Sequence, residues 1–296
     1  MPNPTDPRPY RHLLARLLPS FGIHHARPID TGWGSFILEV NHEWIVRFPR
    51  GLEDSRRVEA EARLLNKLAL RLPVPVPQYK HICKDADGRL RLVIYPKIVG
   101  RPLPTRNLYG AISRQWQADI LRTLQALERF PRHLGRWLGV EWSAERGRTA
   151  RWRTLYPRIR RRVHPLLSPA VRARDRTYWE SFLRDEASLK RPPTLNHGDL
   201  FPYHIIVNDR GVAGILDWES ACYEDPVGNL TGLPLADGFA ARIIDRALGD
   251  SASVSRRLTF HRHAVPAYSV LYGLQTKNRD RIRIGLRSYS RTIPPL

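Results

Sequence analysis

Two aspartates, Asp199 and Asp217, stand at the outer ends of a segment that has the pattern of a β-hairpin. Apolar runs at residues 204–207 and 212–216 flank a polar turn at 208–211, an order typical of two short strands joined by a tight turn. Because a hairpin brings its outer ends together, we expect the two carboxylates to meet in space. Converging carboxylates can accept a substrate proton and hold a divalent cation.

The residues around this pair resemble the catalytic loop and metal-binding strand of the protein-kinase superfamily. His197-Gly198-Asp199 is similar to the loop carried by aminoglycoside and macrolide phosphotransferases, and Asp217-Trp218 stands where protein kinases carry Asp-Phe-Gly. Asp225-Pro226 resembles the Asp-Pro that follows in antibiotic kinases. The fifth position after Asp199 is His204 rather than Asn, which resembles the macrolide branch more than the aminoglycoside branch.

This resemblance implies a role for each residue of the loop and hairpin. Asp199 accepts the proton of an acceptor hydroxyl or orients its oxygen, His197 supports the loop by hydrogen bonding, and Asp217 holds Mg²⁺ between the nucleotide phosphates. His204 is a second candidate metal ligand, although Mg²⁺ prefers oxygen to imidazole nitrogen. Hydrogen bonding to Asp199 or to a metal-bound water, and a purely structural histidine, are the alternatives for His204.

A glycine-containing turn near the N-terminus resembles the phosphate-covering loop of a kinase. Gly32, Gly34 and Ser35 lie in this turn and are candidate nucleotide contacts, although taken alone the pattern is more typical of an ordinary hairpin turn. The next β-type segment presents Arg47 where kinases carry a phosphate-binding Lys. The planar guanidinium suits phosphate, and a solvated arginine on a strand face is the alternative.

Residues 55–72 have apolar side chains at helical spacing and predict a helix with one buried face. The pattern around Glu61 resembles helix C of antibiotic kinases, and we therefore predict an ion pair between Glu61 and Arg47. Glu59 lies on a different face of this helix, where we expect it to pair with Arg63.

Residues 91–98 run from a β-type segment into Gly100 and occupy the position of the hinge between kinase lobes. The resemblance makes Tyr95, Lys97 and Ile98 the residues at the purine edge, and Ile206 on the first arm of the hairpin is a further predicted nucleotide contact. Backbone recognition does not separate ATP from GTP, and the macrolide branch uses GTP, so both remain candidate donors.

The resemblance and the order of elements predict an α+β protein with a two-lobed protein-kinase-like fold. Residues 1–98 would form a small β-rich N-lobe, and residues 99–296 would form a larger, mainly helical C-lobe. The length of 296 residues allows two such lobes. An apolar content of 42% and a charged content of 26% are those of a globular protein.

The net charge bears on the acceptor, since 49 Lys and Arg against 28 Asp and Glu leave +21. Such a field repels polycationic aminoglycosides, and a macrolide or another small hydroxylated molecule poor in amines fits better. A non-catalytic nucleotide- or polyanion-binding protein on a kinase-like fold is the alternative function, motivated by this charge and by His204 and Asn229, which depart from the family pattern. No nucleic-acid-binding motif accompanies the arginines, so a solvated basic face is favoured over nucleic-acid contact, which the charge alone leaves open.

We expect a cytoplasmic protein without a membrane partner. The N-terminal residues lack the apolar core of a secretion signal, and no apolar run approaches the roughly 20 residues that cross a bilayer. Cys83 and Cys222, the two cysteines, have no metal or redox spacing, which favours a reducing compartment.

Overall fold

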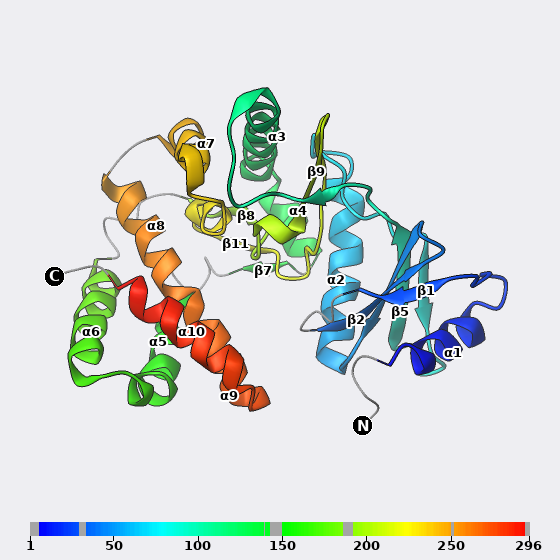
Figure 1. Ribbon diagram of the computed structural model, residues 1–296, viewed down its shortest axis with the longest axis horizontal. Coiled ribbons are helices and arrows are strands. Elements are labelled where there is room, and N and C mark those ends of the chain that lie inside the picture. Colours follow the sequence, from blue (N-terminus) through cyan, green and yellow to red (C-terminus); the bar gives the residue numbers. More distant parts are fainter. Residues whose placement is uncertain are drawn as a thin grey trace.

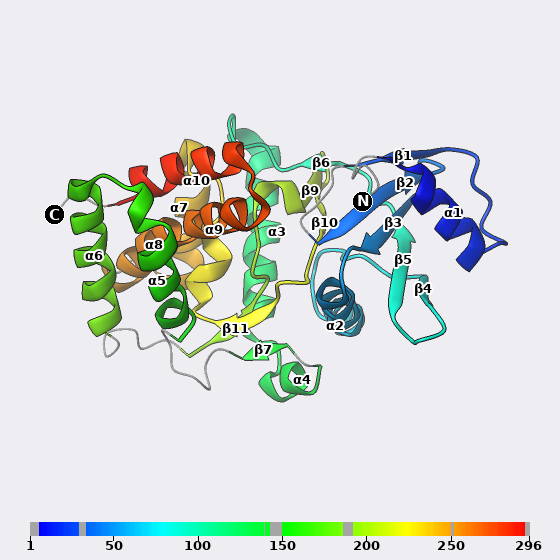
Figure 2. The ribbon, with the colours of Figure 1, turned by 90° about the horizontal axis from the view of Figure 1, so that it is seen from below.

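The computed structural model describes residues 6–29, 34–138, 140–142, 150–185, 192–249 and 252–293. A β-rich N-terminal part and a larger, mainly helical C-terminal part lie at opposite ends of the molecule (Figure 1). The view from below shows the same separation, with the predicted hairpin between the two parts (Figure 2). The predicted α+β architecture with two parts is therefore confirmed.

The N-terminal part is a five-stranded antiparallel sheet in the order β1-β2-β3-β5-β4. Its strands are β1 (Ala26–Pro28), β2 (Ser35–Val40), β3 (Trp44–Pro49), β4 (His81–Lys84) and β5 (Leu90–Pro96). Alternation along β2 and β3 places Phe36, Leu38, Val46 and Phe48 on an outer face that packs against helix α1 (Arg8–Leu17). The same alternation places Arg47 on the inner face.

Helix α2 (Leu52–Leu68) contributes Val58 to a small apolar cluster with Val93 of the sheet. We predicted this helix over residues 55–72, but it begins earlier and ends earlier. Its start is fixed by Asp54, whose carboxylate accepts a hydrogen bond from the Gly51 N–H at 3.0 Å. This local cap satisfies a backbone donor that would otherwise have no partner at the helix end.

The predicted hairpin is present as strands β9 (Ile205–Asn208) and β10 (Gly211–Ile215), which pair antiparallel. The short strand β6 (Arg101–Pro102) extends it on one edge. The carboxylate of Asp119 accepts a hydrogen bond from the Val212 N–H at 2.9 Å and thereby anchors the turn. A second small sheet joins β8 (Thr194–Asn196), β11 (Cys222–Glu224) and β7 (Glu141–Trp142), so that the chain before and after the hairpin is tied together.

Helices make up most of the C-terminal part. They are α3 (Gly110–Glu128), α4 (Arg132–Trp137), α5 (Ala150–Arg162), α6 (Pro169–Arg184), α7 (Phe239–Leu248), α8 (Ala252–Ala264), α9 (Pro266–Thr276) and α10 (Arg279–Arg291), with short 3₁₀ turns η2 (His164–Leu166), η4 (Pro202–His204), η5 (Pro226–Leu230) and η6 (Ala236–Gly238). One core joins α3 and the hairpin to the apolar side chains at the end of α2, and another lies among α5, α6, α8, α9 and α10. Within the described ranges, every helix is too short or too polar to span a bilayer.

Candidate active site

The loop that follows β8 turns sharply at Gly198, whose φ is +83°. A Cβ at this position would collide with the carbonyl oxygen of Ser220, so neither the backbone conformation nor the space admits a side chain. The turn places Asp199 beside the segment after β10, where Asp217 has a φ of +62°. A non-glycine residue in this region of conformational space is uncommon and is frequently found at functional sites.

His197 joins the loop to the end of the hairpin through both ring nitrogens. Its Nε2–H donates to the Leu216 carbonyl at 2.8 Å, and its Nδ1 accepts from the Asp199 N–H at 3.2 Å. Burial lowers the pKa of His197 to about 4, and the neighbouring His204 contributes in the same direction. The ring is therefore neutral near pH 7 with both nitrogens engaged, which is the geometry of a support rather than of a proton acceptor.

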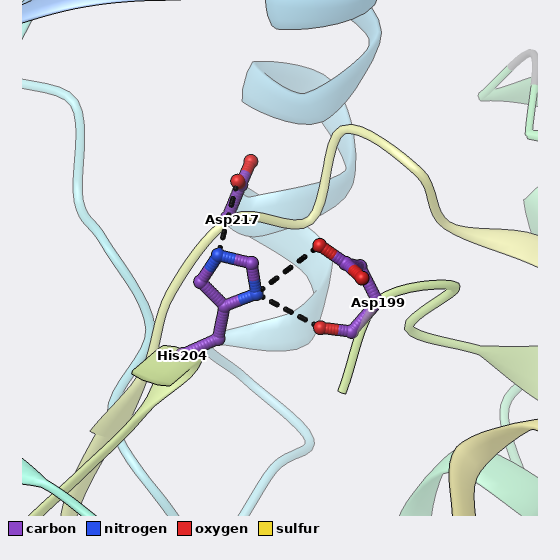
Figure 3. Close-up of side chains that lie close together, drawn as sticks. All are labelled: Asp199, His204 and Asp217. Carbon is purple, nitrogen blue, oxygen red and sulfur yellow. Dashed lines mark hydrogen bonds and ion pairs between the residues drawn. The ribbon is translucent and has the colours of Figure 1, made fainter. Parts of the chain in front are cut away.

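Asp199 and Asp217 meet through His204, as Figure 3 shows. The Nδ1 of His204 lies 2.8 Å from the carbonyl oxygen of Asp199 and 3.5 Å from its Oδ2. The Nε2 lies 3.3 Å from Oδ2 of Asp217. The predicted convergence of the two carboxylates is thus present.

The contacts of His204 require a proton or a cation between its ring and the Asp217 carboxylate. Because its Nδ1–H donates to the Asp199 carbonyl, a neutral ring carries its lone pair on Nε2, which faces the carboxylate of Asp217. The lone pair on Nε2 and the carboxylate oxygen of Asp217 repel each other at this distance unless a proton or a cation lies between them. One ligand atom from each of Asp199, His204 and Asp217 lies within 4.8 Å of the others, and a histidine whose other nitrogen donates to a backbone carbonyl is typical of metal sites.

Arg47 is the buried cation of a second cluster. Its Nη1 donates to Oε2 of Glu61 at 2.9 Å and to the Tyr79 hydroxyl at 3.3 Å, and its Nη2 contacts Oδ1 of Asp217 at 3.4 Å and Oε2 of Glu219 at 2.9 Å. The predicted ion pair with Glu61 is therefore present. These contacts join β3, α2 and the segment after the hairpin.

Glu61, not Glu59, faces Arg47. The Glu61 carboxylate is buried and accepts a further hydrogen bond from the Trp218 N–H at 2.8 Å, so it also fixes the segment after Asp217. The expectation that Glu59 pairs with Arg63 is wrong, since Glu59 pairs with Lys84 Nζ at 2.8 Å. The neighbouring sheet brings Lys84 to this face of the helix, a contact that helical spacing does not reveal.

Burial shifts the pKa values of the carboxylates in this region upward. It raises the pKa of Glu61, although Arg47 acts in the opposite direction. The pKa of Glu219 is raised to about 7 by burial and then by the charge of Asp217. The pKa of Asp199 is raised mainly by burial, against the lowering effect of His204, and a raised pKa makes this carboxylate a stronger proton acceptor.

The inner face of the sheet holds two buried donors without an acceptor in the described part of the chain, Ser35 Oγ and Arg47 Nε. Phosphate oxygens are acceptors that would satisfy such groups. Gly34 lies beside them, and its carbonyl accepts from the Arg50 N–H at 2.9 Å. Gly32 lies outside the described residues.

The predicted base-edge residues lie between the sheet and the hairpin. Tyr95 is buried and pairs with β3, and Ile98 packs closely on β10 at Gly214 while Ile206 is buried on β9. The N–H of Lys97 donates to the Glu43 carbonyl at 2.7 Å and is therefore engaged within the sheet. The pairing of β3 with β5 continues beyond the end of each strand.

The family of this chain follows from its similarity to known proteins. A model described as the phosphotransferase enzyme family matches residues 25–253, well over half of the chain. The chain belongs to this family. The uncharacterized protein YcbJ of Bacillus subtilis (strain 168) is 24% identical over 258 residues, which are 83% of this chain and 82% of that protein.

Solved structures agree on the fold of this phosphotransferase. The GDP and kanamycin complex of APH(2")-IIIa has a TM-score of 0.88 at 22% identity, over 96% of this chain and 97% of that one. Macrolide 2'-phosphotransferase type I has a TM-score of 0.76 at 20% identity, over 98% and 97%. The predicted kinase-like fold and the resemblance to antibiotic phosphotransferases are therefore confirmed.

Beside the catalytic loop of the phosphotransferase, two acids that follow the hairpin are each paired with an arginine. Nη1 of Arg151 lies 2.8 and 2.9 Å from the two carboxylate oxygens of Glu224, and its Nε donates to the Tyr268 hydroxyl at 2.9 Å. Arg257 Nη1 pairs with one carboxylate oxygen of Asp225. These acids are thus already neutralised within the chain.

Sequence reasoning missed the parts played by Asn229 and Glu219. The side-chain oxygen of Asn229 accepts from the His197 N–H at 2.8 Å, and its Nδ2 donates to the Leu195 carbonyl at 3.2 Å. An amide supplies both a donor and an acceptor here, which an ionised carboxylate does not, so the departure from the family Asp has a structural reason. Glu219 had one usable signal, its position two residues after Asp217.

Proposed function

We propose that this phosphotransferase moves the γ-phosphoryl group of ATP or GTP to a hydroxyl of a small molecule. Asp199 accepts the hydroxyl proton, and Arg47, steadied by Glu61, positions the nucleotide phosphates. His204 and Asp217 are the residues that would hold Mg²⁺, which supplies charge stabilisation when bound. The observation that carries the proposal is the meeting of two carboxylates at His204, with ligand atoms within 4.8 Å.

We further propose that the acceptor is poor in amines, so that a macrolide is favoured over an aminoglycoside. Glu224 and Asp225 are each neutralised by an arginine, and the chain carries a net charge of +21. Both features oppose the binding of a polycation. The solved relative that holds kanamycin shows what that protein binds, and the charge around this chain's loop argues for a different preference.

A phosphotransfer screen tests the proposal. ATP and GTP would be supplied separately with Mg²⁺ and offered macrolides, aminoglycosides and a set of hydroxylated metabolites, with the phosphorylated product measured by mass spectrometry. We expect turnover that is lost in Asp199→Asn and retained in Asp209→Asn, a matched change at an exposed acid on the hairpin turn. Nucleotide binding without any turnover or hydrolysis would instead establish the non-catalytic function.

A further inference from the structure

The Arg47 side chain has no accessible hydrogen left for a nucleotide. A guanidinium carries four N–H groups on its two Nη atoms. Here Nη1 contacts Glu61 and Tyr79, and Nη2 contacts Asp217 and Glu219. The remaining Nε–H is buried and has no acceptor among the described residues. Phosphate binding at the Nη atoms therefore requires one of these partners to leave, and the buried Nε–H becomes reachable only with such a rearrangement.

Glu219 is the partner that can leave at the lowest cost. The Glu61 carboxylate is fully buried and also accepts hydrogen bonds from Tyr79 and from the Trp218 N–H, so its departure would leave two more groups unsatisfied. Asp217 is shared with His204. Within the described chain, Arg47 is the one hydrogen-bond donor to Glu219, whose side chain is 16% exposed.

The Glu219 carboxylate lies where the phosphates are expected. Its Oε2 contacts Nη2 of Arg47, and its Oε1 lies 3.4 Å from the point that a Cβ on Gly34 would occupy. It is thus enclosed by the phosphate-covering segment, the phosphate-binding arginine and the segment that carries Asp217. Its Oε2 thus holds a hydrogen-bonding position at Arg47 that a phosphate oxygen would need.

The charge of the cluster explains what would release Glu219. Ligand atoms of Glu61, Asp217 and Glu219 all lie within 4.8 Å of one another, and when all three carboxylates are ionised, one guanidinium leaves two of the three negative charges uncompensated. A nucleotide without a metal adds further negative charge to this place. A divalent cation beside Asp217 supplies the missing positive charge and a new partner for Glu219.

We propose that Glu219 is a positioning residue that couples the divalent cation to the nucleotide. It holds Arg47 in the free protein and gives up Arg47 to the nucleotide phosphates when a cation beside Asp217 takes over its charge. This inference rests on the proposed function, since it assumes that nucleotide phosphates bind Arg47. Its consequence is that metal-free nucleotide binds poorly and that Mg²⁺ strengthens binding steeply.

The test compares dissociation constants for ATP and GTP, measured by titration calorimetry in EDTA and in Mg²⁺, for wild type and Glu219→Gln. We expect Glu219→Gln to bind metal-free nucleotide about tenfold or more tightly than wild type, because one carboxylate charge and one competitor for Arg47 are removed. The ratio of the two constants, with and without Mg²⁺, should fall accordingly. Glu219→Ala should show the same direction, and Glu53→Gln, a change at an exposed acid on α2, should match wild type.

The outcomes separate this inference from the proposed function. Metal-free affinity that is unchanged or weaker in both Glu219 variants, with phosphotransfer by wild type intact, overturns the coupling and leaves the function standing. Wild type that binds neither nucleotide in either condition overturns both.

Discussion

Around Arg47 three carboxylates share one guanidinium, whereas around Asp175 one carboxylate receives hydrogen bonds from three side chains. The Arg47 cluster lies between the sheet and the hairpin. The Asp175 cluster, made of Asp175, His164, His263 and Tyr289, lies among η2, α6, α8 and α10 at the other end of the molecule (Figures 1 and 2).

Every oxygen of the buried Asp175 carboxylate has a donor. Nε2 of His164 lies 2.7 Å from Oδ2, Nε2 of His263 lies 2.6 Å from Oδ1, and the Tyr289 hydroxyl donates to Oδ2 at 3.0 Å. That hydroxyl in turn accepts from Trp179 Nε1 at 2.8 Å. A buried network with all members satisfied rigidifies the elements that it joins.

The difference separates a site that gains from binding from one that does not. The Arg47 cluster has surplus negative charge and a buried Nε without an acceptor, so a cation together with phosphate oxygens would complete it. The Asp175 cluster is already complete, and any change to it only removes bonds. We therefore expect mutations at the first to alter function and mutations at the second to alter stability.

The largest expected effect is that of Asp199→Asn on turnover. Loss of a proton-accepting group should lower kcat by about 10²–10⁴-fold. Because the Asp199 side chain is 38% exposed, the substitution should leave the midpoint of urea unfolding nearly unchanged. Steady-state kinetics and a urea titration on the same preparations check this. A variant that lost activity together with stability would remove the distinction between the two regions.

Asp175→Asn should produce the opposite result. An amide cannot accept from three donors, and breaking a buried charged network should lower the free energy of unfolding by about 3–5 kcal/mol. The dissociation constant for nucleotide, measured well below the unfolding transition, should remain that of wild type. Asp245→Asn, at an exposed acid on α7, is the matched control and should stay within about 0.5 kcal/mol.

Tyr289→Phe should have a smaller effect in the same direction. It removes one hydrogen bond to Asp175 and the acceptor of Trp179 Nε1, which should cost about 1.5–3 kcal/mol in unfolding free energy. Tyr178→Phe on α6 is the control, because its hydroxyl has no hydrogen-bond partner in the described part of the chain. Equal stability of these two variants would show that the Asp175 cluster contributes little.

The two regions also differ in how far the sequence predicts them. Asp199 and Asp217 belong to one hairpin, and local alternation with a polar turn was enough to bring them together. Arg47 and Glu61 were paired through the family resemblance of the strand and helix that carry them. In both cases the information lies in short segments whose structure follows from their own residues.

Contacts that depend on packing between distant segments could not be predicted in this way. Arg47 and Glu219 are 172 positions apart, and Asp175 is 114 positions from Tyr289. Neither pair has a spacing that indicates contact. The engagement of the Lys97 N–H by Glu43 likewise follows from the register of β3 against β5, which the sequence of either strand does not fix.

The smallest expected effect is a difference in acid stability. Burial alone would raise the pKa of Asp175, but hydrogen bonds from His164 and His263 outweigh it, and the pKa is lowered from its ordinary value of 3.8. The stability that this carboxylate contributes is therefore full above that value and is lost as the pH falls through the lowered folded pKa. Urea midpoints of wild type and Asp175→Asn, measured from pH 6 down to pH 2, should approach each other only below about pH 3.8. Parallel curves would mean that the carboxylate keeps its charge throughout this range or that its charge does not stabilise the fold.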